Sequence, residues 1–252
     1  MLSNTVPKIP LPSSSSTWQR CLEHLLLQCR DDRPGAPLLV ITESLFSMEG
    51  TSPALTELSA LCRQHGAQLL LDEAHALGVL GDGGRGLGYR MSDVTMISGT
   101  FGKSFGSGGA FLACDEALGD HLLQSSGAFR YTTALAPSLA AAALAALQLI
   151  QDNPSWGAEL LQRGEIWRAR LQTAGWTRPM GTGPILPLVV GDDQTSLDLQ
   201  GELEQAGLLT VAIRPPTVPE GCARLRLVLH RTLPDETLDS LIQVLARTGS
   251  AQ

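Results

Sequence analysis

Short apolar runs alternate along the first two thirds of the chain with segments whose apolar residues recur at helical spacing. The runs predict buried strands at 37–42, 68–72, 93–98 and 108–114. The helical spacing predicts helices at 17–29, 52–65, 116–124, 138–151 and 156–174. Strands and helices that alternate in this way are typical of an α/β fold with a mainly parallel sheet.

Local signals sharpen two of these boundaries. Ser52 followed by Pro53 predicts the start of a helix, with the serine as N-cap, and Gly66 predicts its end. The helix at 17–29 is expected to give way to a polar turn over 31–35.

After Gly175 the pattern changes to short strands and fewer helices. Strands are predicted at 185–190, 208–213 and 224–229, with helices at 197–206 and 235–246, which together describe a small α+β domain. We therefore predict an N-terminal loop and helix over 1–36, a large domain over 37–152 and a small C-terminal domain over 153–252.

Composition and charge narrow the classes of function. The 18 Lys and Arg against 25 Asp and Glu give a net charge of −7, and no basic cluster is present, which argues against nucleic acid or an anionic membrane as a partner. The longest apolar stretch, 139–150, is too short to span a bilayer. Five scattered cysteines and five scattered histidines show no metal-ligand spacing, so no metal and a reducing, cytoplasmic location are expected.

The first 22 residues contain no acid and include a serine run at 13–16. Such a composition is found in transit peptides, but no Arg-rich amphipathic helix accompanies it. A surface loop leading into the first helix is the favoured interpretation.

Two segments, 69–78 (LLLDEAHALG) and 99–109 (GTFGKSFGSGG), could carry chemistry. A nucleotide-hydrolysing site is one interpretation, since the first resembles a DEAH box and the second contains Gly-Lys-Ser. The phosphate loop would need a glycine at position 97, which is Ile97, and it should precede the acidic residue instead of following it. Plain turns with a solvated lysine are a second interpretation.

Pyridoxal phosphate is the third interpretation and accounts for both segments. Asp72 at a strand end can keep the pyridine nitrogen protonated, and Lys103 can bond the aldehyde if burial and the cofactor lower the lysine pKa. His75 can donate to the ring oxygen, and the Thr100 hydroxyl can reach the phosphate.

The sequence resembles the α-oxoamine synthases, fold-type-I pyridoxal-phosphate enzymes, over roughly residues 37–246. The matching segments are TESLFSMEG at 42–50, LDEAHALGVLGDGGRG at 71–86, SGTFGKSFGSGG at 98–109, FRYTTALAP at 129–137 and AIRPPTVPEGCARLRLVL at 212–229. The block at 213–219 is most similar to the 8-amino-7-oxononanoate synthase branch. The resemblance implies condensation of L-alanine with a pimeloyl thioester, carried by coenzyme A or a carrier protein, with release of CO₂.

The resemblance also implies roles for single residues. Lys103, Asp72 and His75 would be catalytic and bind the cofactor. Ser47 and Thr100 would contact the cofactor, and Thr133 would reach the phosphate bound by the other subunit of a homodimer. Thr217 and Arg226 would bind substrate, with the Arg226 guanidinium on the carboxylate; a surface charge on the strand that also carries Arg224 is the alternative for Arg226.

The chain differs from the family in one respect. Family members begin with a segment that carries a glycine-rich phosphate-binding turn and a ring stacked on the cofactor, and residues 1–36 contain no counterpart. Three hypotheses follow: a partial oxononanoate synthase, a related synthase that uses glycine or serine with another acyl thioester, and a non-catalytic fragment or pseudo-subunit. One face of a bound cofactor would be left uncovered.

Overall fold

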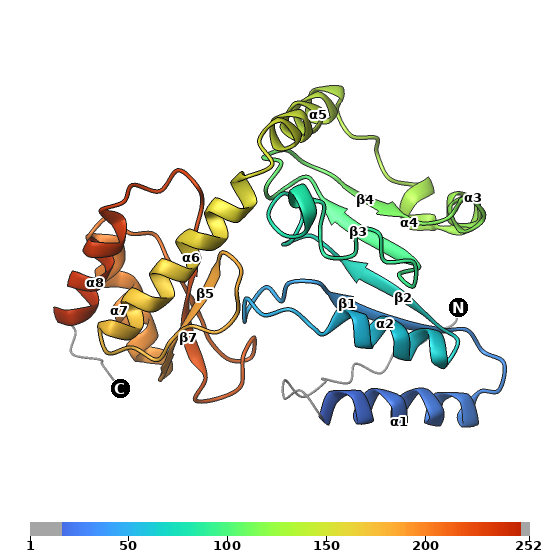
Figure 1. The fold of residues 1–252 in the computed structure, drawn as a ribbon, viewed down its shortest axis with the longest axis horizontal. Coiled ribbons are helices and arrows are strands. Elements are labelled where there is room, and N and C mark those ends of the chain that lie inside the picture. The colour runs from blue at the N-terminus through green and yellow to red at the C-terminus, as the bar shows by residue number, and fades with distance from the viewer. Residues whose placement is uncertain (1–16, 248–252) are drawn as a thin grey trace.

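The structure, a computed structural model, describes residues 17–247 and contains two β-sheets, each with its own helices (Figure 1). Predictions for residues 1–16 lie outside this range. The elements of the first part are α1 (Thr17–Asp32), β1 (Leu38–Glu43), α2 (Leu55–Gln64), β2 (Ala67–Asp72), a 3₁₀ turn at Asp82–Gly84, β3 (Met96–Thr100), β4 (Ala110–Ala113), α3 (Glu116–Ser125), α4 (Gly127–Arg130) and α5 (Pro137–Asp152). Those of the second part are α6 (Trp156–Thr173), β5 (Ile185–Gly191), α7 (Asp193–Gln205), β6 (Val211–Ile213), β7 (Ala223–Val228) and α8 (Thr237–Arg247).

The first sheet has the order β1-β2-β3-β4, with β1, β2 and β3 parallel and β4 antiparallel to β3. This arrangement confirms the mainly parallel α/β fold. Helices α1 and α2 cover one face, where the alternate side chains of β1 and β2 meet buried helical residues; the buried members of this core are Leu22, Leu26, Leu55, Leu58, Cys62, Leu69 and Leu71.

The opposite face of the first sheet is open along both of its outer strands. On β1, Leu39 is 46% exposed and Ile41 is 61% exposed, and on β4 Leu112 is 43% exposed. Parallel sheets are usually covered on both faces, because their strands carry apolar residues on both sides. Within residues 17–247, no strand pairs with the outer edge of β1 or of β4.

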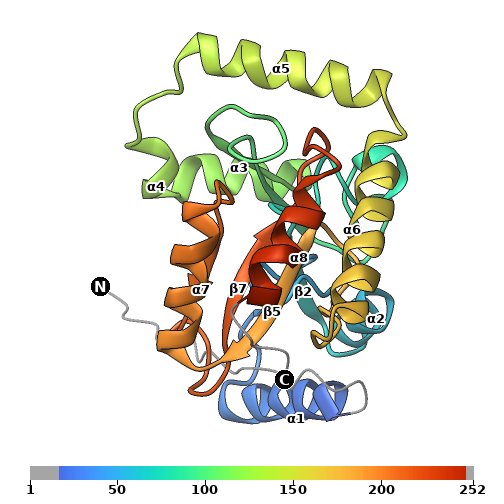
Figure 2. The same cartoon turned by 90° about the vertical axis from the view of Figure 1, so that its left-hand side faces the viewer.

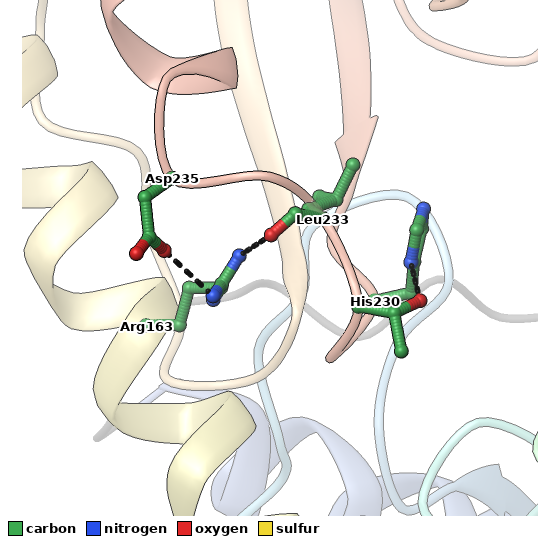
Figure 3. A network of polar contacts seen from close by, with 5 residues as sticks. Arg163, His230, Leu233 and Asp235 are labelled. Atoms are coloured by element: carbon green, nitrogen blue, oxygen red, sulfur yellow. Dashed lines mark hydrogen bonds and ion pairs between the residues drawn. The ribbon is translucent and has the colours of Figure 1, made fainter.

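The second sheet is antiparallel, in the order β5-β7-β6. Helices α6, α7 and α8 pack on one of its faces (Figure 2), around a core that includes Leu186, Leu188, Leu225 and Leu227. Arg163 on α6 ties that helix to the segment before α8, since its guanidinium donates to the Leu233 carbonyl and, at 3.0 Å, to Asp235 (Figure 3). The division at residues 152 and 153 stays a prediction.

Several predicted boundaries were wrong by a few residues. Helix α1 runs to Asp32, into the predicted turn, and β3 begins at Met96 because Val94 donates its N–H to Met91 in a turn. Ser52 is not an N-cap: α2 begins at Leu55, after Ala54, with no side-chain cap. Residues 51–54 lie outside any helix or strand, and the preceding Gly50 packs closely against Ile185 of the second sheet.

Candidate functional site

The parallel strands end together at one edge of the first sheet, and this edge carries most of the predicted site. Glu43 at the end of β1 pairs in register with Asp72 at the end of β2, and Asp72 with Ser98 on β3. The Asp72 carboxylate accepts the Ala74 N–H at 2.8 Å, which holds it at the start of the following turn. The structure therefore presents Asp72 at the sheet edge where α/β folds bind ligands.

His75 lies in the turn after β2 and is half-buried. Burial, followed by the positive charges of Lys103 and Arg226, lowers the pKa of His75 to about 4, against an opposing effect of Asp72. Asp72, Lys103 and Arg226 therefore lie near enough to His75 to affect its charge, although they come from three separate parts of the chain. His75 is neutral at pH 7, so its ring can donate one hydrogen bond and accept another.

A pH experiment follows from this pKa. The pKa of His75 is lower in the folded than in the unfolded protein, so the unfolded protein binds a proton first as the pH falls. The free energy of unfolding is therefore highest above pH 6.5 and decreases as the pH falls from about 6.5 to about 4. Between pH 7.5 and pH 4.5, we expect the free energy of unfolding of His75→Gln to fall by about 2 kcal/mol less than that of the unaltered chain, as measured by urea unfolding. The exposed His121→Gln is the matched control; equal losses in both variants would contradict the assignment.

Lys103 lies in the loop between β3 and β4, and its side chain is exposed. Lys103 is therefore not buried within the described residues, whereas its neighbours on both sides are held by hydrogen bonds. Gly102 donates to the Thr100 hydroxyl at 3.1 Å, and Ser104 donates to the Leu77 carbonyl at 2.5 Å. The Thr100 hydroxyl donates its proton to the Gly109 carbonyl at 3.1 Å, which braces the base of the loop.

Ser47 and Arg226 meet from opposite sheets. Arg226 lies on the β7 face that has no helices, and its Nη1 donates to the Ser47 carbonyl at 3.5 Å. The Arg226 Nε is buried and has no hydrogen-bond partner within the described residues. Arg226 is half-buried, and the choice between substrate binding and a surface charge stays open. Arg224, on the same face of β7, is 7% exposed and pairs with Glu49 at 3.6 Å.

Thr133 and Thr217 are not joined to this cluster by any hydrogen bond within residues 17–247. Thr133 lies between α4 and α5, and Thr217 follows the cis peptide bond between Pro215 and Pro216; both are exposed. Their roles stay predictions.

Sequence reasoning missed two acidic residues at this edge. Glu43 accepts the Ser47 N–H at 3.0 Å. Glu73 is 1% exposed and accepts hydrogen bonds of 2.5 Å from the Ser44 hydroxyl and the Gly88 N–H. Both could have been found from the sequence, because each lies at the end of a predicted strand and Glu73 directly follows Asp72.

A cavity of about 560 Å³ lies near this edge but holds none of the predicted residues. Its wall is mainly apolar and includes Leu77, Phe101, Phe105, Phe111, Leu147 and Ile150. Residues 17–247 contain no group of three or more His, Cys, Asp or Glu that could hold a metal ion. In the same range, no helix has the length and apolar character needed to cross a membrane.

The sequence of this chain is similar to those of known proteins. The chain is 44% identical over 228 residues to an 8-amino-7-oxononanoate synthase of Chromohalobacter salexigens, which covers 89% of this chain and 58% of that protein. The chain thus spans somewhat more than half the length of such relatives.

Solved structures give the same result for the fold. A serine palmitoyltransferase of Sphingomonas wittichii is 28% identical with a TM-score of 0.84, over 92% of this chain and 59% of that one. An 8-amino-7-oxononanoate synthase of Francisella tularensis is 26% identical with a TM-score of 0.74, over 88% of this chain and 65% of that one. The model of the family described as aminotransferase class I and II matches residues 3–245, and the chain therefore belongs to that family.

Proposed function

We propose that this chain forms the lysine-bearing part of a pyridoxal-phosphate site in an enzyme that condenses L-alanine with a pimeloyl thioester, releases CO₂ and makes 8-amino-7-oxononanoate. The observation that carries the proposal is that Lys103, and Arg226 from the second sheet, lie near His75 and Asp72 at the edge of the first sheet. The relatives named 8-amino-7-oxononanoate synthase, at 39–46% identity, support the choice of reaction.

The residues present fit the cofactor. Bound pyridoxal phosphate supplies an aldehyde for amines and a ring that withdraws electrons. Asp72 provides the carboxylate for the ring nitrogen, and neutral His75 can donate to the ring oxygen. The hydroxyl groups of Ser47 and Thr100 would contact the cofactor, although that of Thr100 would first have to leave the Gly109 carbonyl.

The remaining roles concern the substrate. The Lys103 amine would bond the aldehyde and then move the proton at the amino acid's α-carbon. The Arg226 guanidinium, with a buried donor to spare, would hold the substrate carboxylate, and Thr217 would lie beside it. Thr133 would serve the partner subunit of a homodimer, and a cytoplasmic location accompanies this biosynthetic role.

Cofactor labelling tests the proposal directly, because the chain contains only two lysines, Lys8 and Lys103. After incubation with pyridoxal phosphate, we expect a visible absorption band that borohydride reduction fixes on Lys103, as read by peptide mass mapping. Lys103→Ala should abolish the band, whereas Lys8→Ala should keep it. A label on Lys8 or on the terminal amine alone, or no band, would contradict cofactor binding by this chain.

The choice of amino acid needs a second measurement. A chain that binds the cofactor should change its spectrum with alanine at lower concentration than with glycine or serine, and release of CO₂ with a pimeloyl thioester would complete the assignment. A preference for serine or glycine would favour the related synthases of this fold instead. Binding without turnover would support a non-catalytic subunit.

A further inference from the structure

The loop at 44–50 is one of the segments through which the two sheets meet, together with the turn after β2. It leaves the end of β1 and reaches the face of the second sheet that carries no helices (Figure 1). Arg224 on β7 pairs with Glu49 at 3.6 Å, and Arg226 donates to the Ser47 carbonyl at 3.5 Å. The position of this loop therefore contributes to where the second sheet places Arg226.

Glu43 holds the same loop from the first sheet. Its carboxylate accepts the Ser47 N–H at 3.0 Å, four residues along the chain. Ser47 is thus held at both of its backbone groups, the N–H by Glu43 and the carbonyl by Arg226. Two hydrogen bonds to one residue connect the end of β1 with β7.

The position of Glu43 is electrostatically unfavourable. Burial raises the pKa of Glu43, as do the nearby carboxylates of Asp72 and Glu49, whereas the Ser47 N–H and Lys103 lower it. Like charges at register-paired positions destabilise a sheet. Of the two favourable interactions of the Glu43 carboxylate, only the one with the Ser47 N–H is a hydrogen bond.

Arg226 depends on this arrangement because its other contacts are few. Its Nε is buried without a partner in the described chain, and its bond to the Ser47 carbonyl is long. A small displacement of Ser47 would therefore be enough to release the guanidinium.

We propose that Glu43 is a positioning residue: by holding the Ser47 N–H it places the Ser47 carbonyl against Arg226 and so fixes the guanidinium that receives the substrate carboxylate. The substrate part of this inference rests on the proposed function. Glu43 itself contacts neither substrate nor reacting atoms in this role.

Amide hydrogen exchange tests the brace without any cofactor. In Glu43→Ala we expect the Ser47 amide, resolved by NMR, to exchange at least about tenfold faster than in the unaltered chain. Glu43→Gln keeps a carbonyl acceptor and should restore protection. The exposed Glu57→Gln on α2 is the matched control, since it removes a carboxylate charge outside the loop at 44–50, and it should leave exchange unchanged. Equal protection in Glu43→Ala, or equal loss in Glu57→Gln, would overturn the proposal.

A titration with alanine tests the consequence for the substrate. In the cofactor-loaded chain, Glu43→Ala should need about tenfold more alanine for half of its spectral change, a larger loss than that of its affinity for pyridoxal phosphate. Glu43→Gln should behave as the unaltered chain does. A parallel loss of cofactor and alanine affinity would overturn the positioning role. If the unaltered chain takes up no pyridoxal phosphate, the proposed function fails for this chain alone, and the exchange experiment still decides whether Glu43 holds Ser47.

Discussion

Glu73→Ala is expected to lower the free energy of unfolding by about 3 kcal/mol or more. The side chain is 1% exposed, and it joins three segments that are distant in the sequence: its own turn after β2, Ser44 after β1, and the loop at Gly88. Removing the carboxylate leaves the Ser44 hydroxyl and the Gly88 N–H buried without an acceptor. Each unsatisfied group costs about 1–3 kcal/mol, and the emptied space adds a further cost.

Urea unfolding at pH 7.5 measures this effect. The exposed Glu236→Ala removes the same side chain from the surface and should change the free energy of unfolding by less than about 0.5 kcal/mol. Glu73→Gln should fall between the two, because an amide accepts one of the two hydrogen bonds but presents a donor to the other. A Glu73→Ala variant as stable as the control would show that these bonds contribute nothing net.

Gly50→Ala is expected to have the second large effect, a loss of about 3–5 kcal/mol in the free energy of unfolding. Gly50 has a φ of +65°, and a Cβ built on it would lie 2.2 Å from the Ile185 carbonyl oxygen of β5. Both groups in this contact belong to the backbone, so no side chain can turn away to make room. The steric clash can be removed only if the loop moves away from β5. Since Gly50 ends the loop that carries Ser47, we also expect the variant to lose alanine binding.

Gly83→Ala provides a matched control for the backbone term. Gly83 has a φ of +59°, but no atom lies within 4 Å of a Cβ built there. This variant should therefore show only the cost of a left-handed conformation, about 1–2 kcal/mol. Calorimetric or urea unfolding of both variants separates the two terms, and equal losses would show that the contact with Ile185 adds nothing.

The sequence predicted those parts of the site that local patterns encode. A strand that ends in Asp72, followed by a turn with His75, can be recognised from the apolar run alone, and the structure places both residues at the sheet edge. The direction of β4 could not be recognised, because a four-residue strand looks the same parallel or antiparallel. The start of α2 was wrong because the contact of Gly50 with a strand more than 130 residues away overrides the local signal of Ser52.

The polar contacts between the two sheets also could not be predicted from the sequence. Arg226 alternates with apolar residues along β7, so the strand pattern alone would place it on a solvated face. That face is partly covered in the folded chain because the loop at 44–50 packs against it. The bracing roles of Glu43 and Glu73 have the same origin, since each depends on backbone N–H groups whose positions only the folded chain sets.

The open side of the first sheet has a practical consequence for any work with this chain. Leu39, Ile41 and Leu112 present an apolar surface that adjoins two strand edges with no strand partner within residues 17–247. Most proteins protect such edges with charge, proline or a covering element, because bare edges recruit further strands from other molecules. The quantity of monomer that stays in solution will therefore depend on protein concentration and on mild additives that mask apolar surface. Titrations of ligand binding should accordingly be run dilute and checked at two protein concentrations.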